Sequence, residues 1–324
     1  MRLIAKLQVP ITGIQIRHLQ TVGAKLLFRS AYAGVVGFDM EDVSPLNQFD
    51  FILGWRPSQK GQVLLHSALQ AVDVLALHEG GLTGAGIWVS VIDSGIITSD
   101  PALGSIVVAR MDFTGEGAYD YALHGTLVAK IINAIASDAS LLNAKAVDRY
   151  GDVDEIAVFQ ALEWSLDNGA DIANLSLGFQ RECHGDCWLC QFVDTLVEQG
   201  MTVVAAAGNW GPSDGTISCP GNAARAVTVG ATEAGAITPY SSRGRADQEK
   251  PDVVAPGTIE VGRFHLSGTS IAAPMVSGIL ASLYGPYERQ KVLGSLSTGC
   301  ADLGFSRNQQ GYGQIDAHKI LEVL

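Results

Sequence analysis

From residue 66 onward, the chain alternates between short apolar runs and longer segments in which apolar residues recur at helical spacing. An apolar run without alternation is typical of a strand buried on both faces, as in a parallel sheet. Strands of this kind separated by helices indicate an α/β fold with helices on both faces of the sheet. The predicted strands cover residues 87–92, 140–146, 172–177, 202–207 and 226–231, and the predicted helices cover residues 68–75, 156–168 and 192–199.

Residues 1–65 follow a different pattern. Short strands are predicted at residues 24–29, 32–38 and 49–55, a short helical stretch begins at Met40, and residues 56–62 are polar. A polar segment between two patterned regions is typical of a domain boundary. We therefore expect a small α+β unit with its linker over residues 1–65 and a larger domain over residues 66–324.

The composition narrows the class of protein. The 324 residues are 47% hydrophobic and 17% charged, which suits a tightly packed α/β protein. The net charge of −12 argues against nucleic acid or an anionic membrane surface as a partner. No apolar run reaches the roughly 20 residues that span a bilayer, and the first residues show no continuous apolar segment like that of a secretory signal. We expect the cytoplasm rather than secretion.

Four polar residues stand where a parallel sheet places its functional groups, at strand ends and helix starts. Asp93 closes the strand at 87–92, and Asn209 follows the strand at 202–207. His124 begins a predicted helix, and Ser270 lies in the first turn of another, directly after Gly268 and Thr269. A helix N-terminus stabilises an oxyanion, so a serine placed there suits a nucleophile. Each residue taken alone could equally be a helix cap.

The order Asp, His, Ser along the chain is that of subtilisin. The motifs around these residues resemble those of subtilisin-like serine proteases, from about Ser67 to the closing motif at residues 311–317. They are VIDSG at 91–95, HGT at 124–126, NLSLG at 174–178, AAGN at 206–209, VVAPG at 253–257 and GTSIAAP at 268–274. The resemblance implies a three-layer subtilisin-like fold and a serine endopeptidase that works through an acyl-enzyme and needs no cofactor for catalysis.

The resemblance also implies a role for each residue. Ser270 attacks the scissile carbonyl, His124 is the general base, and Asp93 orients the imidazole. The Asn209 amide and the Ser270 backbone N–H hold the oxyanion. An extended peptide or protein substrate is expected to pair with two edge segments and to enter a pocket between small residues. The implied substrate-binding residues are Ser176, Leu177 and Gly178, Gly151, Asp152 and Val153, and Ala205, Ala206, Ala207 and Gly208.

The acidic residues Asp152, Asp154 and Glu155 lie where the family binds the second and fourth residues upstream of the cut. They favour basic side chains at those substrate positions. The alternative is a solvated acidic loop without a role in specificity.

Residues 1–65 stand where this family carries a propeptide, which assists folding and inhibits the enzyme until it is cut off. The resemblance implies a self-processing zymogen that is cut between about Gln59 and Ser67. A propeptide would need a strand and a helix within residues 1–18, and the pattern there does not locate them. A permanent N-terminal domain is the alternative.

Two features depart from the family pattern. The helix after His124 lacks the insertion that binds calcium in many secreted relatives, so that calcium site is not predicted, and calcium elsewhere stays open. The second departure is a cysteine-rich insertion. It contains Cys183, Cys187 and Cys190, and the resemblance implies that Cys219 lies in a segment bordering the same pocket, so that the four could meet. They could then bind zinc, form two disulfides or remain buried thiols. Cys300 is expected in the core.

Two other functions remain as alternatives. A catalytically idle member of the family would use the cleft only to hold peptides. A different serine hydrolase, such as an esterase, is disfavoured because the chain has no Gly-x-Ser-x-Gly elbow and the order of the three residues is wrong for that fold.

Overall fold

The computed structural model describes residues 2–8, 12–29, 34–57, 66–261 and 264–324. The chain divides into two compact units, Met1–Gln62 and Val63–Leu324. Residues 58–62 of the predicted linker lie outside the described residues, and residues 56 and 57 belong to the last strand of the N-terminal unit. Among the described helices, none combines the length and the apolar character that a membrane crossing needs.

Within its described residues, the N-terminal unit is a four-stranded antiparallel sheet in the order β2-β3-β1-β4, with one α-helix and a 3-10 helix. Its apolar core includes Leu3, Leu7, Phe38 and Leu46. The elements are β1 (Arg2–Leu7), α1 (Gly13–Thr21), β2 (Lys25–Arg29), β3 (Val35–Asp39), the 3-10 helix η1 (Ser44–Gln48) and β4 (Ile52–Pro57).

Strand β1 and helix α1 are the two elements that the sequence pattern did not locate. Helix α1 begins with a capping box, in which the Thr12 hydroxyl accepts from Gln15 N–H and the Gln15 side chain accepts from Thr12 N–H. This Thr-x-x-Gln spacing is a signal readable from sequence. The helical stretch predicted to begin at Met40 is wrong, because the 3-10 helix begins at Ser44 and contains a proline in its first turn.

The larger unit is built on one long sheet in the order β15-β16-β12-β10-β9-β8-β5-β7-β6. All neighbours from β16 to β6 are parallel, as predicted. The strands are β5 (Trp88–Asp93), β6 (Val107–Asp112), β7 (Ser140–Lys145), β8 (Ile172–Leu175), β9 (Thr202–Ala206), β10 (Val227–Glu233), β12 (Val253–Pro256), β15 (Cys300–Ala301) and β16 (Gln314–Ile315), with β11 (Ala236–Ile237) antiparallel to β10.

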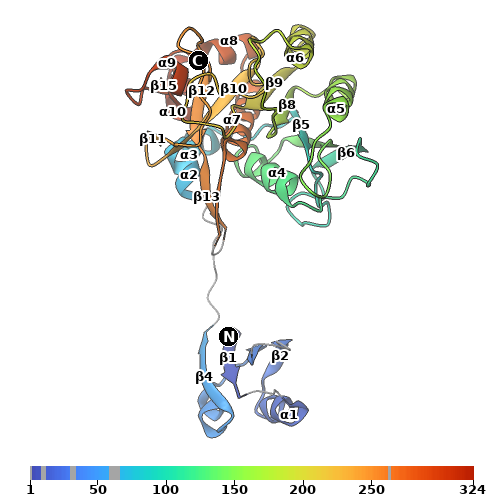
Figure 1. Cartoon of the computed structure of the whole chain (residues 1–324). Coiled ribbons are helices and arrows are strands. Elements are labelled where there is room, and N and C mark those ends of the chain that lie inside the picture. The colour runs from blue at the N-terminus through green and yellow to red at the C-terminus, as the bar shows by residue number, and fades with distance from the viewer. Residues whose placement is uncertain (1, 9–11, 30–33, 58–65, 262–263) are drawn as a thin grey trace. The chain divides into compact units, whose positions relative to one another are not determined.

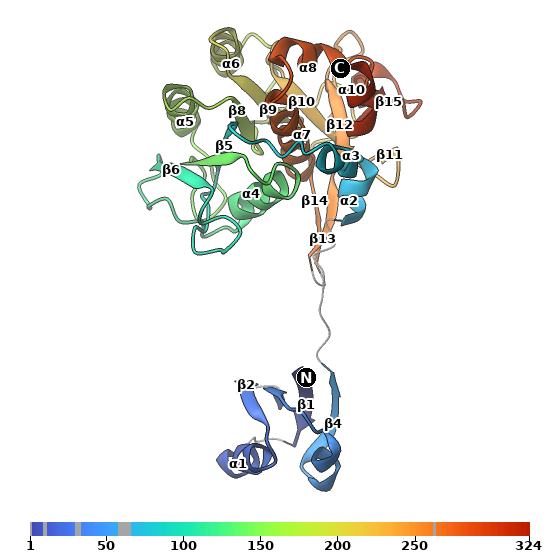
Figure 2. The same ribbon diagram turned by 180° about the vertical axis from the view of Figure 1, so that it is seen from behind.

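Helices cover both faces of this sheet, which gives three layers (Figures 1 and 2). Along β5, Val89 and Val91 join the core with α4 and α7, whereas Ile92 joins the core with α5 and α6. This alternation explains why the strand is apolar on both faces. The helices are α2 (His66–Ala71), α3 (Val74–Glu79), α4 (His124–Ile135), α5 (Glu155–Asp167), α6 (Trp188–Glu198), α7 (Thr269–Tyr284), α8 (Arg289–Ser295), α9 (Arg307–Gln310) and α10 (Ala317–Val323).

The single helix predicted at residues 68–75 is wrong. The segment forms α2 and α3, and Asp73 between them has a left-handed backbone with φ of 51°. Helix α6 begins at Trp188, one turn before the predicted start. The sequence prediction also missed the hairpin of β13 (Thr258–Val261) and β14 (Phe264–Ser267), which leads directly into α7.

Helices α4 and α7 cross closely because α7 carries Gly278 at the contact. A Cβ at Gly278 would stand 2.8 Å from the Cβ of Ile135 on α4. Since these two helices carry His124 and Ser270 near their N-termini, their close packing sets the distance between the two candidate residues.

We predict that Gly278→Val lowers the free energy of unfolding by about 1–3 kcal/mol, because the added methyl groups overpack this contact. Gly294→Ala in α8 is the matched control, because its added Cβ meets nothing within 4 Å. It should leave stability unchanged or raise it by up to about 1 kcal/mol. Urea titrations of both variants in a Ser270→Ala background give the comparison, and equal stability of the two would contradict the packing argument.

Candidate active site

The buried carboxylate of Asp93 is bonded to the imidazole of His124. Asp93 ends β5 and is 1% exposed, and its Oδ1 lies 2.7 Å from Nδ1 of His124, the first residue of α4. The Ser94 N–H donates to the same oxygen at 2.7 Å. Because a carboxylate accepts and does not donate, His124 carries a proton on Nδ1. Its other nitrogen, Nε2, is then left as the basic one.

This pair changes the ionisation of the imidazole. The negative charge of Asp93 raises the pKa of His124 from 6.5 to about 9, with smaller contributions from the hydrogen bond and from Asp120, while burial acts in the opposite direction. A raised pKa means that protonated His124 stabilises the fold. That contribution is complete below about pH 6.5 and is lost as the pH rises through about 9. Solvent screens it, since the His124 side chain is 38% exposed.

Asp120 fixes the turn that presents His124. It is fully buried and accepts from Ser94 Oγ at 2.8 Å, from Leu123 N–H at 2.8 Å and from Thr126 N–H at 2.8 Å. Leu123 has a left-handed backbone with φ of 65°, which these bonds hold in place. The sequence analysis missed Asp120, although an acidic residue just before a helix start is a capping signal.

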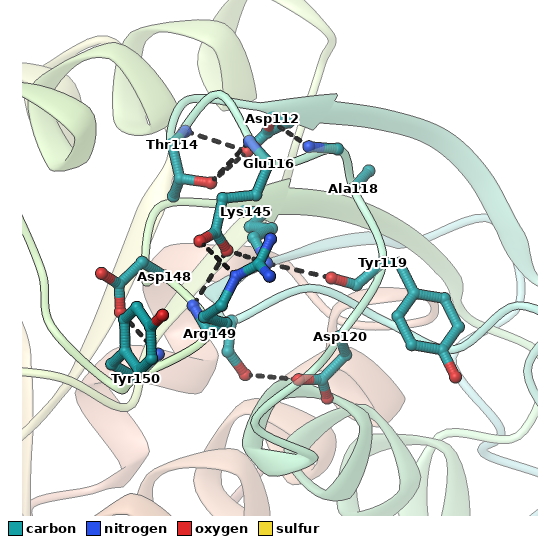
Figure 3. Close-up of polar contacts among 12 residues, drawn as sticks. Asp112, Thr114, Glu116, Ala118, Tyr119, Asp120, Lys145, Asp148, Arg149 and Tyr150 are labelled. Atoms are coloured by element: carbon teal, nitrogen blue, oxygen red, sulfur yellow. Dashed lines mark hydrogen bonds and ion pairs between the residues drawn. The ribbon is translucent and has the colours of Figure 1, made fainter.

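The loop that carries Asp120 is tied to the loop at residues 148–153 (Figure 3). Lys145, fully buried at the end of β7, donates to the Tyr119 carbonyl at 3.0 Å and lies 3.4 Å from Glu116. Glu116 in turn accepts from the backbone N–H of Arg149 at 2.9 Å and from its Nε at 2.8 Å. The loop before His124 and one predicted substrate edge therefore support each other.

Ser270 and Asn209 flank one small space. A Cβ on Gly268 would stand 3.1 Å from Ser270 Oγ and 3.3 Å from Asn209 Nδ2. Glycine at this position keeps the space between the hydroxyl and the amide open. Ser270 is the second residue of α7, so its own backbone N–H belongs to the unpaired positive end of that helix.

Thr269 orients the Asn209 amide. Asn209 Oδ1 accepts from the Thr269 N–H at 2.9 Å and from its hydroxyl at 3.0 Å, and that hydroxyl accepts from Gly208 N–H at 3.1 Å. With the carbonyl oxygen held in this way, Nδ2 is turned toward the space beside Ser270 as a donor. The role of Thr269 was not predicted from sequence.

Ser176 joins the end of β8 to α7. Its hydroxyl donates to the Ser270 carbonyl at 3.0 Å and accepts from Asn174 at 3.0 Å, and Asn174 accepts from Ser277 at 2.8 Å. The Ser176 side chain thus anchors the helix that carries Ser270. His124 and Ser270 themselves share no hydrogen bond in the described structure.

The segment at residues 217–219 joins two of the predicted substrate segments. Ser218 N–H donates to the Ala207 carbonyl at 2.9 Å, and Phe179 pairs with Cys219 as an antiparallel bridge. Gly178 is required here, because its Cβ would stand 2.3 Å from Ser218 Oγ. The predicted pocket residues Ala205, Ala206 and Ala207 are buried.

The third predicted segment includes Gly151, Asp152 and Val153, where Val153 bridges to Val147. Asp154 caps α5 by accepting from Ile156 N–H, and Glu155 pairs with Arg181 at 2.9 Å. Two of the three acidic residues considered for specificity therefore have structural partners. Asp152 remains a predicted contact for a basic substrate side chain.

Comparison with known proteins settles the family. The sequence model described as the Subtilase family matches residues 84–296. The chain belongs to the subtilase family. The resemblance to subtilisin-like serine proteases is confirmed, and with it the three-layer fold.

The curated relatives include M-protease of Shouchella clausii, 35% identical over 66% of this chain and 58% of that protein. Subtilisin E of Bacillus subtilis is 35% identical over 64% of this chain and 57% of that protein. The chain thus spans a little more than half the length of these two subtilases. Subtilisin Savinase of Lederbergia lenta is 33% identical over 77% of this chain and 96% of that protein.

The fold is also that of a solved structure titled as a lanthipeptide protease. The similarity has a TM-score of 0.68 at 22% identity and covers 80% of this subtilase chain and 94% of the other. At this level of identity the likeness concerns the fold alone.

We predict that Asp93→Asn lowers the pKa of His124 from about 9 toward its ordinary value of 6.5, because the charge that stabilises the imidazolium is removed. The measurement is an NMR titration of the His124 ring protons in a Ser270→Ala background. The Ser270→Ala protein that retains Asp93 gives the reference titration of His124. An unchanged His124 midpoint would show that Asp93 does not control this imidazole.

Proposed function

We propose that this subtilase is a serine endopeptidase that hydrolyses peptide bonds through an acyl-enzyme formed on Ser270. The observation that carries the proposal is the 2.7 Å bond between buried Asp93 and His124, which fixes one imidazole nitrogen as a donor and leaves the other as a base. The Asn209 amide beside Ser270 supports it, since Thr269 holds that amide in a donating orientation. Relatives named as proteases and subtilisins agree with this function.

In the proposed reaction, His124 Nε2 takes the proton of Ser270 as the hydroxyl attacks the scissile carbonyl. The imidazolium is stabilised by Asp93, and the negative charge on the carbonyl oxygen is held by Asn209 Nδ2 and the Ser270 N–H. Collapse of the intermediate passes the proton to the leaving amine, and water repeats the sequence to release the acid. No cofactor takes part in these steps.

We further propose that residues 1–65 act as a propeptide, so that the chain is a zymogen that cuts itself between about Gln59 and Ser67. Two features support this: the N-terminal unit has its own core and its own sheet, and it precedes the catalytic unit along the chain. The substrate is then a peptide or protein, and the first one is the chain itself.

We predict that Ser270→Ala abolishes hydrolysis of a casein or fluorogenic peptide substrate and also prevents removal of the N-terminal unit. The hydroxyl is the only side-chain nucleophile in the proposed mechanism, and without it no acyl-enzyme forms, so the loss should reach the background rate. The assay combines peptide turnover with the intact mass of each purified protein. Wild type should show a chain shorter by about 59–66 residues, and the variant should keep its full mass.

Ser297→Ala is the matched control, since this exposed serine bonds only to the Gly294 carbonyl. It should behave as wild type in both assays. Turnover by Ser270→Ala would contradict the catalytic assignment. A full-length mass for an active wild type would instead contradict the zymogen proposal alone and would identify residues 1–65 as a permanent domain.

A further inference from the structure

Four cysteine side chains meet beside the predicted substrate segments at residues 176–178 and 205–208. Cys183 and Cys187 come from the segment between β8 and α6, and Cys190 lies in the first turn of α6. The fourth, Cys219, comes from the segment that follows β9. Cys183 Sγ lies 3.8 Å from Cys190 Sγ, and Cys187 Sγ lies 3.5 Å from Cys219 Sγ. All four sulfur atoms lie within 4.8 Å of one another, although the fourth is 29 or more residues along the chain from the others.

These distances fit one metal ion with four sulfur ligands in tetrahedral coordination. Four thiolates at about 2.3 Å from zinc stand about 3.8 Å from one another at the corners of a tetrahedron. Two separate disulfides would need only two close pairs, whereas here every sulfur is close to every other. The sulfur atoms are also too close together to surround an iron–sulfur cluster.

We propose that Cys183, Cys187, Cys190 and Cys219 bind one zinc ion. Each thiol gives its proton to solvent and forms one sulfur–zinc bond, so the site carries a net charge of −2 and no oxidation occurs. The ion has no open coordination position and is therefore structural and takes no part in hydrolysis.

The local backbone is shaped for such a site. Gly185 N–H donates to Cys183 Sγ at 3.3 Å, in a turn that needs the positive φ of 87° at Gly185. Cys187 is the N-cap of α6, and Cys190 lies in its first turn, where the positive helix end favours thiolates.

Positive side chains stand nearby to offset the charge. Arg245 donates to the Cys183 carbonyl at 3.3 Å. The charge of Arg181 interacts with Cys187 and Cys219. Cys190 and Cys219 are fully buried, so water would reach the bound ion only with difficulty.

The proposed zinc site is connected to the segments that border the predicted substrate pocket. Cys219 pairs with Phe179 through two backbone hydrogen bonds of 2.8 and 3.0 Å, and its neighbour Ser218 bonds to Ala207. Zinc would therefore clamp residues 183–190 to the two segments that border the predicted substrate pocket. Only this consequence rests on the proposed function, because the metal site itself stands on the cysteine geometry.

The test measures metal and thiols on the full Ser270→Ala chain, purified with a reductant and without chelator. Elemental analysis should find about one zinc per chain. A thiol reagent should leave the four cluster cysteines unmodified in the folded protein and should modify all four after zinc is extracted with a chelator. The extracted protein should bind Co²⁺ and show the absorption of tetrahedral cobalt thiolate.

The variants Cys219→Ser and Cys187→Ser should each lower the zinc content at least tenfold, and Cys300→Ser is the matched control that should keep it. Three results would overturn the proposal. They are an intact mass lower by four hydrogen atoms without metal, five reactive thiols without metal, and full zinc content in both cluster variants. Because the Co²⁺ test uses the extracted Ser270→Ala chain with all of its cysteines present, a misfolded cysteine variant does not decide the outcome, and the readouts do not depend on peptidase activity.

Discussion

The buried charge of Asp93 is the constraint on which the site depends. A carboxylate that is 1% exposed at the end of a central strand is costly unless donors surround it. The imidazole N–H of His124 and the backbone N–H of Ser94 both donate to its Oδ1, whereas its buried Oδ2 has no hydrogen-bond partner among the described residues. Helix α4 must therefore begin next to the end of β5. Gly125 makes this approach possible, because a Cβ there would stand 2.3 Å from the Gly95 carbonyl.

The rest of the site follows from the parallel sheet. The carboxyl ends of β5, β8 and β9 lie at one edge, so Asp93, Ser176 and Asn209 are delivered to the same side by separate strands. Helices α4 and α7 start at that edge and supply His124 and Ser270. Hydrogen bonds with Thr269, Asn174 and Asp120 then fix the orientations of the Asn209 amide, the Ser176 hydroxyl and the turn before His124.

The sequence predicts the structure well where one residue type, or one spacing of apolar residues, dominates a segment. Continuous apolar runs predicted the central strands, and local glycine-containing motifs predicted Asp93, His124, Asn209 and Ser270. It was uninformative where a long-range contact decides the structure. The break at Asp73, the early start of α6 at Trp188, and the roles of Asp120 and Lys145 depend on partners that are distant in sequence. Helix α1 is different, because its capping box at Thr12 and Gln15 was readable and was overlooked.

For the cysteine cluster too, the sequence predicts the residues involved, whereas long-range contacts decide how they are arranged. Spacing alone left zinc, disulfides and thiols open, and the meeting of Cys219 with the insertion came from the family resemblance. The distances among the four sulfur atoms add what spacing lacks, namely that all four converge on one point. A site of this kind beside the cleft would stabilise the pocket without entering the chemistry.

The most direct test of the account is covalent labelling with a fluorophosphonate, followed by peptide mapping. We expect one adduct per chain, located on Ser270, with no labelling in Ser270→Ala and strongly slowed labelling in His124→Ala. The labelling rate of wild type should rise from neutral pH toward about pH 9 as His124 loses its proton. An adduct on another serine, or labelling of Ser270 that does not depend on His124, would contradict the proposed mechanism.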